Sequence, residues 1–183
     1  MFIQTEETPN PATMKFLPSR DVMGDGTLDL TDAKAAEASP LAHALFEIEG
    51  IKGVFLGRDF ITVTKDSAKD WKILKPSILT TIMDHFTNNR PVVTPTGATL
   101  AAVGTEDSDV VKQIRELIEM KVRPAVAQDG GDIVFENFDD GIVYLKLKGS
   151  CSGCPSSTMT LKAGIENMLK HYIPEVREVR QAI

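Results

Sequence analysis

The sequence predicts an α+β protein made of two small α+β domains joined by a flexible linker. Two observations support this class. Strand-like and helix-like apolar patterns occur in both halves of the 183-residue chain, and both patterns fail between them. The expected domains are residues 1–88 and 108–183, with the linker at 89–107. A chain of this length can bury two cores of that size.

The first domain is expected to begin with strands and to end with a hairpin and a helix. Strands are predicted where β-branched and aromatic residues cluster, at 2–6, 13–17, 28–30, 51–56 and 60–65. Pro9 and Pro11 impose an extended turn after the first strand, because each proline disfavours helix in its predecessor. A helix should start at Ser39-Pro40 and end at Gly50. A second should cover 74–87, where apolar residues recur every three or four positions.

The second domain follows a stretch rich in Pro, Gly, Thr and Ala, which is typical of a linker. A helix is expected from residue 108, with a kink near Pro124 and a second piece reaching Gln128. A hairpin, a helix and a last strand complete the order α-β-β-α-β, at residues 133–138, 142–147, 156–171 and 176–181.

Composition excludes several classes of function. The chain is 42% hydrophobic and 25% charged, as in ordinary soluble proteins, and no run approaches the roughly 18 apolar residues of a membrane helix. A net charge of −6 argues against nucleic acid binding, which requires a basic face. The first seven residues have no basic or apolar signal, so we expect a cytoplasmic protein or an already trimmed mature form.

The only two cysteines, Cys151 and Cys154, lie between the second hairpin strand and the last helix. Pro155 suits the first position of that helix. Unpaired N–H groups and the positive end of the helix dipole favour thiolates there. Gly149 and Gly153 would allow a ligand to approach the backbone closely. The turn is short, so we expect it to be exposed.

Three chemistries fit the cysteine pair. A redox disulfide needs only the pair, although this half is too short for a complete thioredoxin-like domain. Structural zinc needs four ligands, and the three histidines, His43, His85 and His171, show no metal-binding spacing. An iron–sulfur cluster needs four thiolates, so two chains would have to share it. The spacing favours the cluster and leaves the other two open.

The motifs then resemble a known family. The segment 149–157, preceded by Asp129–Asp132 and by Arg123-Pro124, resembles the C-terminal NifU-like domain of Nfu iron–sulfur proteins. The segment 8–16 resembles the N-terminal domain of the same two-domain proteins. The resemblance covers nearly the whole chain, and both blocks occur in the expected order.

The resemblance implies a scaffold or carrier rather than an enzyme. It would bind a [4Fe–4S] cluster, or a [2Fe–2S] cluster, between two protomers through Cys151 and Cys154. The implied partners are a second copy of the chain upon cluster binding, apo iron–sulfur client proteins and upstream assembly factors. The N-terminal domain has no cysteine and would serve in docking. The location would be the bacterial cytoplasm or, for a trimmed form, the mitochondrial matrix.

Several other residues have a simpler interpretation than a functional one. Asp129–Asp132 is expected to stop a helix, with its glycines at positive φ. Lys121 and Arg123 are expected on a solvated helix face. Met159 should pack in the core, and Trp71 should belong to the core or cover it.

Overall fold

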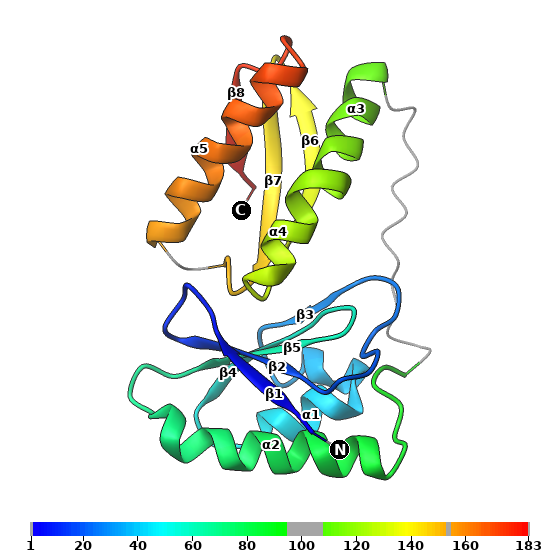
Figure 1. Cartoon of the computed structure of the whole chain (residues 1–183), viewed down its shortest axis with the longest axis vertical. Coiled ribbons are helices and arrows are strands. Elements are labelled where there is room, and N and C mark those ends of the chain that lie inside the picture. The colour runs from blue at the N-terminus through cyan, green and yellow to red at the C-terminus, as the bar shows by residue number, and fades with distance from the viewer. Residues whose placement is uncertain (1, 95–107, 153–154, 183) are drawn as a thin grey trace. The chain divides into compact units, whose positions relative to one another are not determined.

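The computed structural model describes residues 2–94, 108–152 and 155–182. The chain divides into two compact units, Met1–Ala101 and Ala102–Ile183 (Figure 1). Each unit combines one β-sheet with helices, which confirms the predicted α+β class. The predicted linker limits, 89–107, stay a prediction, because most of that segment lies outside the described residues.

The N-terminal unit contains a five-stranded antiparallel sheet with the strand order β1-β2-β5-β4-β3. Its strands are β1 (Gln4–Glu7), β2 (Thr13–Leu17), β3 (Leu28–Leu30), β4 (Ile51–Leu56) and β5 (Ile61–Lys65). Its helices are the 3₁₀ helix η1 (Ala35–Ala38) and the α-helices α1 (Pro40–Phe46) and α2 (Trp71–Thr87). The strands lie within two residues of the predicted positions.

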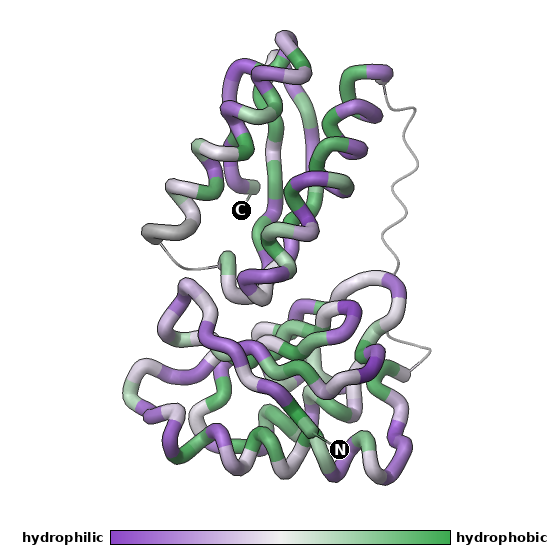
Figure 2. The backbone as a smooth tube through the Cα atoms, viewed as in Figure 1, coloured by the Kyte–Doolittle hydropathy of each residue, from purple (hydrophilic) through white to green (hydrophobic). Residues whose placement is uncertain are grey.

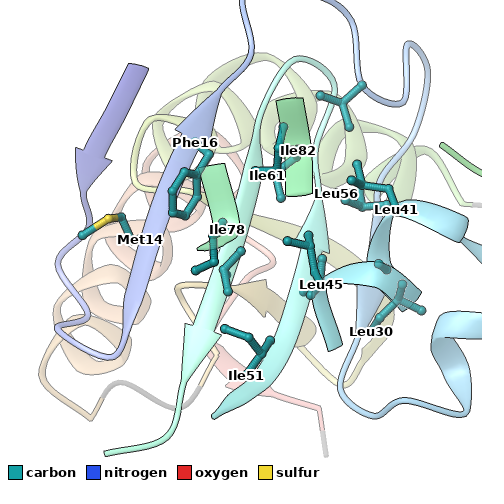
Figure 3. Packing of buried hydrophobic residues seen from close by; sticks show 14 of the residues in the cluster. Met14, Phe16, Leu30, Leu41, Leu45, Ile51, Leu56, Ile61, Ile78 and Ile82 are labelled. Carbon is teal, nitrogen blue, oxygen red and sulfur yellow. The ribbon is translucent and has the colours of Figure 1, made fainter. Parts of the chain in front are cut away.

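The core of this unit lies between one face of the sheet and the two α-helices. Phe16 and Ile61 are direct partners across β2 and β5, and both are fully buried. Ile78 and Ile82 of α2 point into the same space (Figure 3). Hydrophobic and hydrophilic segments alternate along α2 (Figure 2), as expected for a helix that buries one side.

Side-chain caps set where the helices of this unit begin. The Ser39 Oγ accepts a hydrogen bond from the Ala42 N–H at 3.1 Å, so α1 starts at Pro40 as predicted. Asp70 accepts from the Lys72 N–H at 2.9 Å and starts α2 at Trp71, three residues before the predicted position. At the other end, α1 stops at Phe46, short of the predicted limit.

The C-terminal unit has the predicted order α-β-β-α-β. Its sheet is β6-β7-β8, with β6 and β7 antiparallel and β7 and β8 parallel. The strands are β6 (Gly131–Asp139), β7 (Ile142–Gly149) and β8 (Glu178–Gln181). The helices are α3 (Asp109–Leu117), the π-helix η2 (Ile118–Val122), α4 (Arg123–Gln128) and α5 (Pro155–Tyr172). Helix α5 is the crossover that a parallel β7–β8 pair requires (Figure 1).

The first helical segment of this unit changes its geometry before Pro124. Proline has no N–H to continue the α-helical ladder, and the π-turn η2 precedes it instead of a break. Ile114 and Ile118 before this point and Val122 and Val126 around it remain buried in one core cluster. The predicted kink is therefore observed as a π-turn.

Candidate cysteine site

The turn that carries the cysteine motif joins the end of β7 to the start of α5. Gly149, the last residue of β7, has a φ of +66°, which a glycine adopts without strain. Cys151 follows in the turn, and Pro155 is the first residue of α5, as predicted. Cys154 lies outside the described residues. The structure thus places Cys151 close to the N-terminus of an 18-residue helix.

Cys151 is buried, which contradicts the expectation of an exposed turn. Its relative exposure is 5%, and it belongs to the core cluster of the C-terminal unit. The reason is Gly131 at the start of β6. A Cβ atom at Gly131 would lie 2.7 Å from Cys151 Sγ and 2.8 Å from the backbone oxygen of Lys148. Only a residue without a side chain leaves room for the sulfur at this position.

Asp129–Asp132 does end a helix, as expected, and also contacts the cysteine turn. Gly130 has a φ of +78°, and its N–H donates to the Ala127 carbonyl at 3.0 Å, closing α4. The Gly130 carbonyl then accepts from the Ser150 N–H at 3.3 Å, and the Ser150 Oγ donates to the Asp129 carbonyl. Ser150 is 2% exposed. The loop therefore fixes the residue next to Cys151.

Arg123 does not lie on a solvated face, so that expectation is wrong. Its Nε lies 2.8 Å from Asp132 Oδ1 and its Nη2 lies 3.1 Å from Asp132 Oδ2. The Nη1 lies 2.8 Å from Glu119 Oε1. Asp132 is only 4% exposed, so its charge needs this partner. The hydrogen bonding that Arg123 donates to the Asp132 carboxylate, more than any other contact, raises the pKa of Arg123.

Other residues singled out in the sequence lie away from this turn or serve structural roles. Lys121 is exposed, and its Nζ lies 3.2 Å from Tyr172 Oη. Met159 is 76% exposed, so the expected core role is wrong. Trp71 packs against the core of the N-terminal unit, and its Nε1 donates to the Pro11 carbonyl at 3.1 Å. Trp71 therefore covers the proline turn, within the expected role.

No pattern in the sequence predicts the buried titratable group in α2. His85 in α2 is 1% exposed, and its two ring nitrogens have no hydrogen-bond partner within the described residues. Burial, followed by the nearby charge of Arg90, lowers the pKa of His85. Among the residues that the structure describes, no group of three or more His, Cys, Asp or Glu side chains is placed to hold a metal ion.

Comparison with known families gives consistent matches for both units. Residues 3–89 match the family model described as "Scaffold protein Nfu/NifU N terminal", and residues 114–180 match "NifU-like domain". The chain is 52% identical over 184 aligned residues to the Homo sapiens protein named "NFU1 iron-sulfur cluster scaffold homolog, mitochondrial". That alignment covers 100% of this chain and 72% of the human protein. This chain belongs to the Nfu family. The predicted resemblance is confirmed.

A fly relative agrees with this assignment. The Drosophila sechellia protein of the same name is 49% identical to this chain. The alignment covers 99% of this chain and 65% of the fly protein. This chain thus spans about two thirds of the fly relative. A solution structure of a NifU-like protein from Saccharomyces cerevisiae aligns with 52% of this chain and 86% of its own, at 26% identity and a TM-score of 0.47. Among the described helices, none combines the length and apolar character of a membrane span.

Proposed function

We propose that this chain carries an iron–sulfur cluster and transfers it to apo-proteins. The observation that supports this most strongly is the 52% identity, over the entire chain, to a human protein named as an iron–sulfur cluster scaffold. The matched NifU-like segment, 114–180, includes the cysteine turn. A [4Fe–4S] cluster, or a [2Fe–2S] cluster, is the proposed cargo.

Cys151 and Cys154 are the proposed ligands. A [4Fe–4S] or [2Fe–2S] cluster takes four thiolates, and this chain contains two cysteines. Two protomers would therefore each supply one pair. The N-terminus of α5 adds the positive end of a helix dipole, which lowers the cost of holding thiolates and an anionic cluster. Such a shared cluster is released when client thiolates replace first one pair and then the other.

The proposed transfer is ligand exchange rather than catalysis. Its partners would be apo iron–sulfur clients and upstream assembly factors, with the cysteine-free N-terminal unit as their docking module. The comparisons give no support to the alternative of a thiol–disulfide oxidoreductase using the same pair. The names of the human and fly relatives, which include the word mitochondrial, support a mitochondrial location over the bacterial cytoplasm.

Anaerobic reconstitution with iron and sulfide tests this proposal. We expect visible absorption, with iron and acid-labile sulfide bound, and Mössbauer spectra that identify the cluster type. Addition of a chelator-treated apo-aconitase should restore that client's activity and deplete iron from the carrier. A protein that binds no iron, and instead reduces a disulfide substrate in catalytic amounts, would contradict the proposal.

A further inference from the structure

The backbone around Cys151 is held by a loop that lies about 20 positions earlier in the chain. Ser150 is buried, and both its N–H and its hydroxyl bond to carbonyls of this loop, those of Gly130 and Asp129. Gly131 pairs with Gly149 in the β6–β7 ladder, and Cys151 Sγ packs over Gly131. The withdrawn position of the sulfur therefore depends on this loop.

The loop is in turn held by an ion pair between the half-buried Arg123 and the buried Asp132. Arg123 makes two hydrogen bonds to the Asp132 carboxylate, at 2.8 and 3.1 Å, and a third contact to Glu119 at 2.8 Å. Asp132 Oδ1 also accepts from the Ile133 N–H at 2.8 Å. These contacts join the start of α4 to the start of β6 on either side of the loop.

This arrangement conflicts with the geometry of a shared ligand. Cys151 is only 5% exposed, whereas a sulfur that binds a metal shared with a second chain has to lie at the surface of its own chain. Cys151 therefore has to become more exposed to bind a shared iron, and the bonds between Ser150 and the loop oppose that shift.

We propose that Arg123, the Asp129–Asp132 loop and Ser150 form a latch that keeps Cys151 withdrawn until the cluster is loaded. This role deepens the proposed function and depends on it, although the protection of Cys151 can be measured without iron. Asp132 and Ser150 are positioning residues in this scheme, because they act on the ligand through the backbone. The latch also shields a thiol that would otherwise be open to oxidants.

Alkylation kinetics of Cys151 test the latch in the full-length chain. In a Cys154→Ser background, iodoacetamide reports on Cys151 alone: the thiolate displaces iodide and forms a carbon–sulfur bond. The rate is followed by mass spectrometry for the parent chain, for Asp132→Asn and for Ser150→Ala. Glu178→Gln is the matched control, because it removes an exposed ion pair with Arg180, 3.0 Å long, in the same unit. Urea titrations of each variant measure global stability.

The latch predicts that native Cys151 reacts at least about tenfold more slowly than Cys151 in the urea-unfolded chain. Asp132→Asn and Ser150→Ala should each accelerate the native reaction about tenfold, as expected for the loss of a buried, charge-assisted or hydroxyl hydrogen bond. In each variant the native rate should stay well above the unfolded-state rate multiplied by the unfolded fraction, because the reaction goes through a local opening rather than through global unfolding. Glu178→Gln should leave the rate unchanged.

Three results would overturn the latch: equal rates for native and unfolded chains, no acceleration in either variant, or native rates that equal the unfolded-state rate multiplied by the unfolded fraction. If Asp132→Asn fails to fold, Ser150→Ala decides alone, since it leaves the ion pair intact. A chain that shows the predicted alkylation pattern but takes up no iron would contradict the proposed function. It would not contradict the protection of Cys151 by the loop.

Discussion

Two turn motifs, one rich in proline in the N-terminal unit and one rich in glycine and aspartate in the C-terminal unit, are used differently. In the N-terminal unit, the motif at Thr8–Pro11 bonds mainly to its own neighbours. The Thr8 Oγ1 donates to the Asn10 carbonyl at 2.9 Å, and the Asn10 Oδ1 accepts from the Ala12 N–H at 3.0 Å. A long-range bond comes from Trp71, which covers the motif.

In the C-terminal unit, the motif at Asp129–Asp132 bonds to distant segments. It accepts from Ser150 on one side and from Arg123 on the other, and Cys151 packs on its glycine. The first motif is built on prolines and the second on glycines and aspartates, and only the second contacts a cysteine. The contrast shows that long-range contacts connect a turn motif to a reactive side chain.

The largest expected difference between the two units is in iron binding. Cys151→Ser and Cys154→Ser should each reduce iron after reconstitution to background, because each removes half of the thiolates that one chain supplies. Thr8→Ala in the other motif should leave iron content unchanged. Iron and sulfide analysis per chain measures this. Full iron content in either serine variant would refute the ligand assignment.

The next largest effect should come from filling the space that Cys151 occupies. Gly131→Ala places a Cβ 2.7 Å from the sulfur, so we expect a loss of about 1–3 kcal/mol in unfolding free energy, together with a more reactive Cys151. The control is Gly164→Ala in α5, where a Cβ would meet no atom within 4 Å. That change should stabilise the helix by up to about 1 kcal/mol. Urea unfolding distinguishes the two; equal effects would show that Gly131 is not a close contact.

A smaller effect is expected from uncovering the N-terminal motif. Trp71→Phe removes the bond to the Pro11 carbonyl and should cost about 1 kcal/mol. Hydrogen exchange should locate the loss in the N-terminal unit. The rate of Cys151 alkylation should not change. A faster reaction would mean that the two motifs are coupled, which their separate sets of contacts do not predict.

The smallest expected effect is a pH dependence of stability that is confined to the N-terminal unit. Burial lowers the pKa of His85 in the folded state, so the unfolded chain binds the extra proton first as pH falls. The contribution of His85 to stability should therefore be fully present above the ordinary histidine pKa of about 6.5 and should decline as the pH falls below that value toward the lower folded-state pKa. Trp71, the only tryptophan, reports unfolding of this unit by fluorescence. His85→Phe should remove the decline; an unchanged decline would assign it to other groups.

The sequence predicted the fold class, the order of the elements and the position of the cysteine turn. These features depend on the spacing of apolar residues and on turn residues, which act locally. Trp71 was placed outside its helix because the cap at Asp70 was not recognised. The Arg123–Asp132 pair and the burial of Cys151 could not be predicted in this way. Both depend on how β6 and β7 pair, which brings Gly131 opposite Gly149. In the sequence, the only sign of the Arg123–Asp132 pair was the position of a charged residue, Arg123, near the glycine-containing Asp129–Asp132 loop.

The central claim is that one chain supplies half of the ligands and that the cluster is shared. Native mass spectrometry of the anaerobically reconstituted protein tests it most directly. We expect the iron-containing species to hold two chains and one cluster, and Cys154→Ser to remain an iron-free monomer. A single chain that carries a complete cluster would contradict the account.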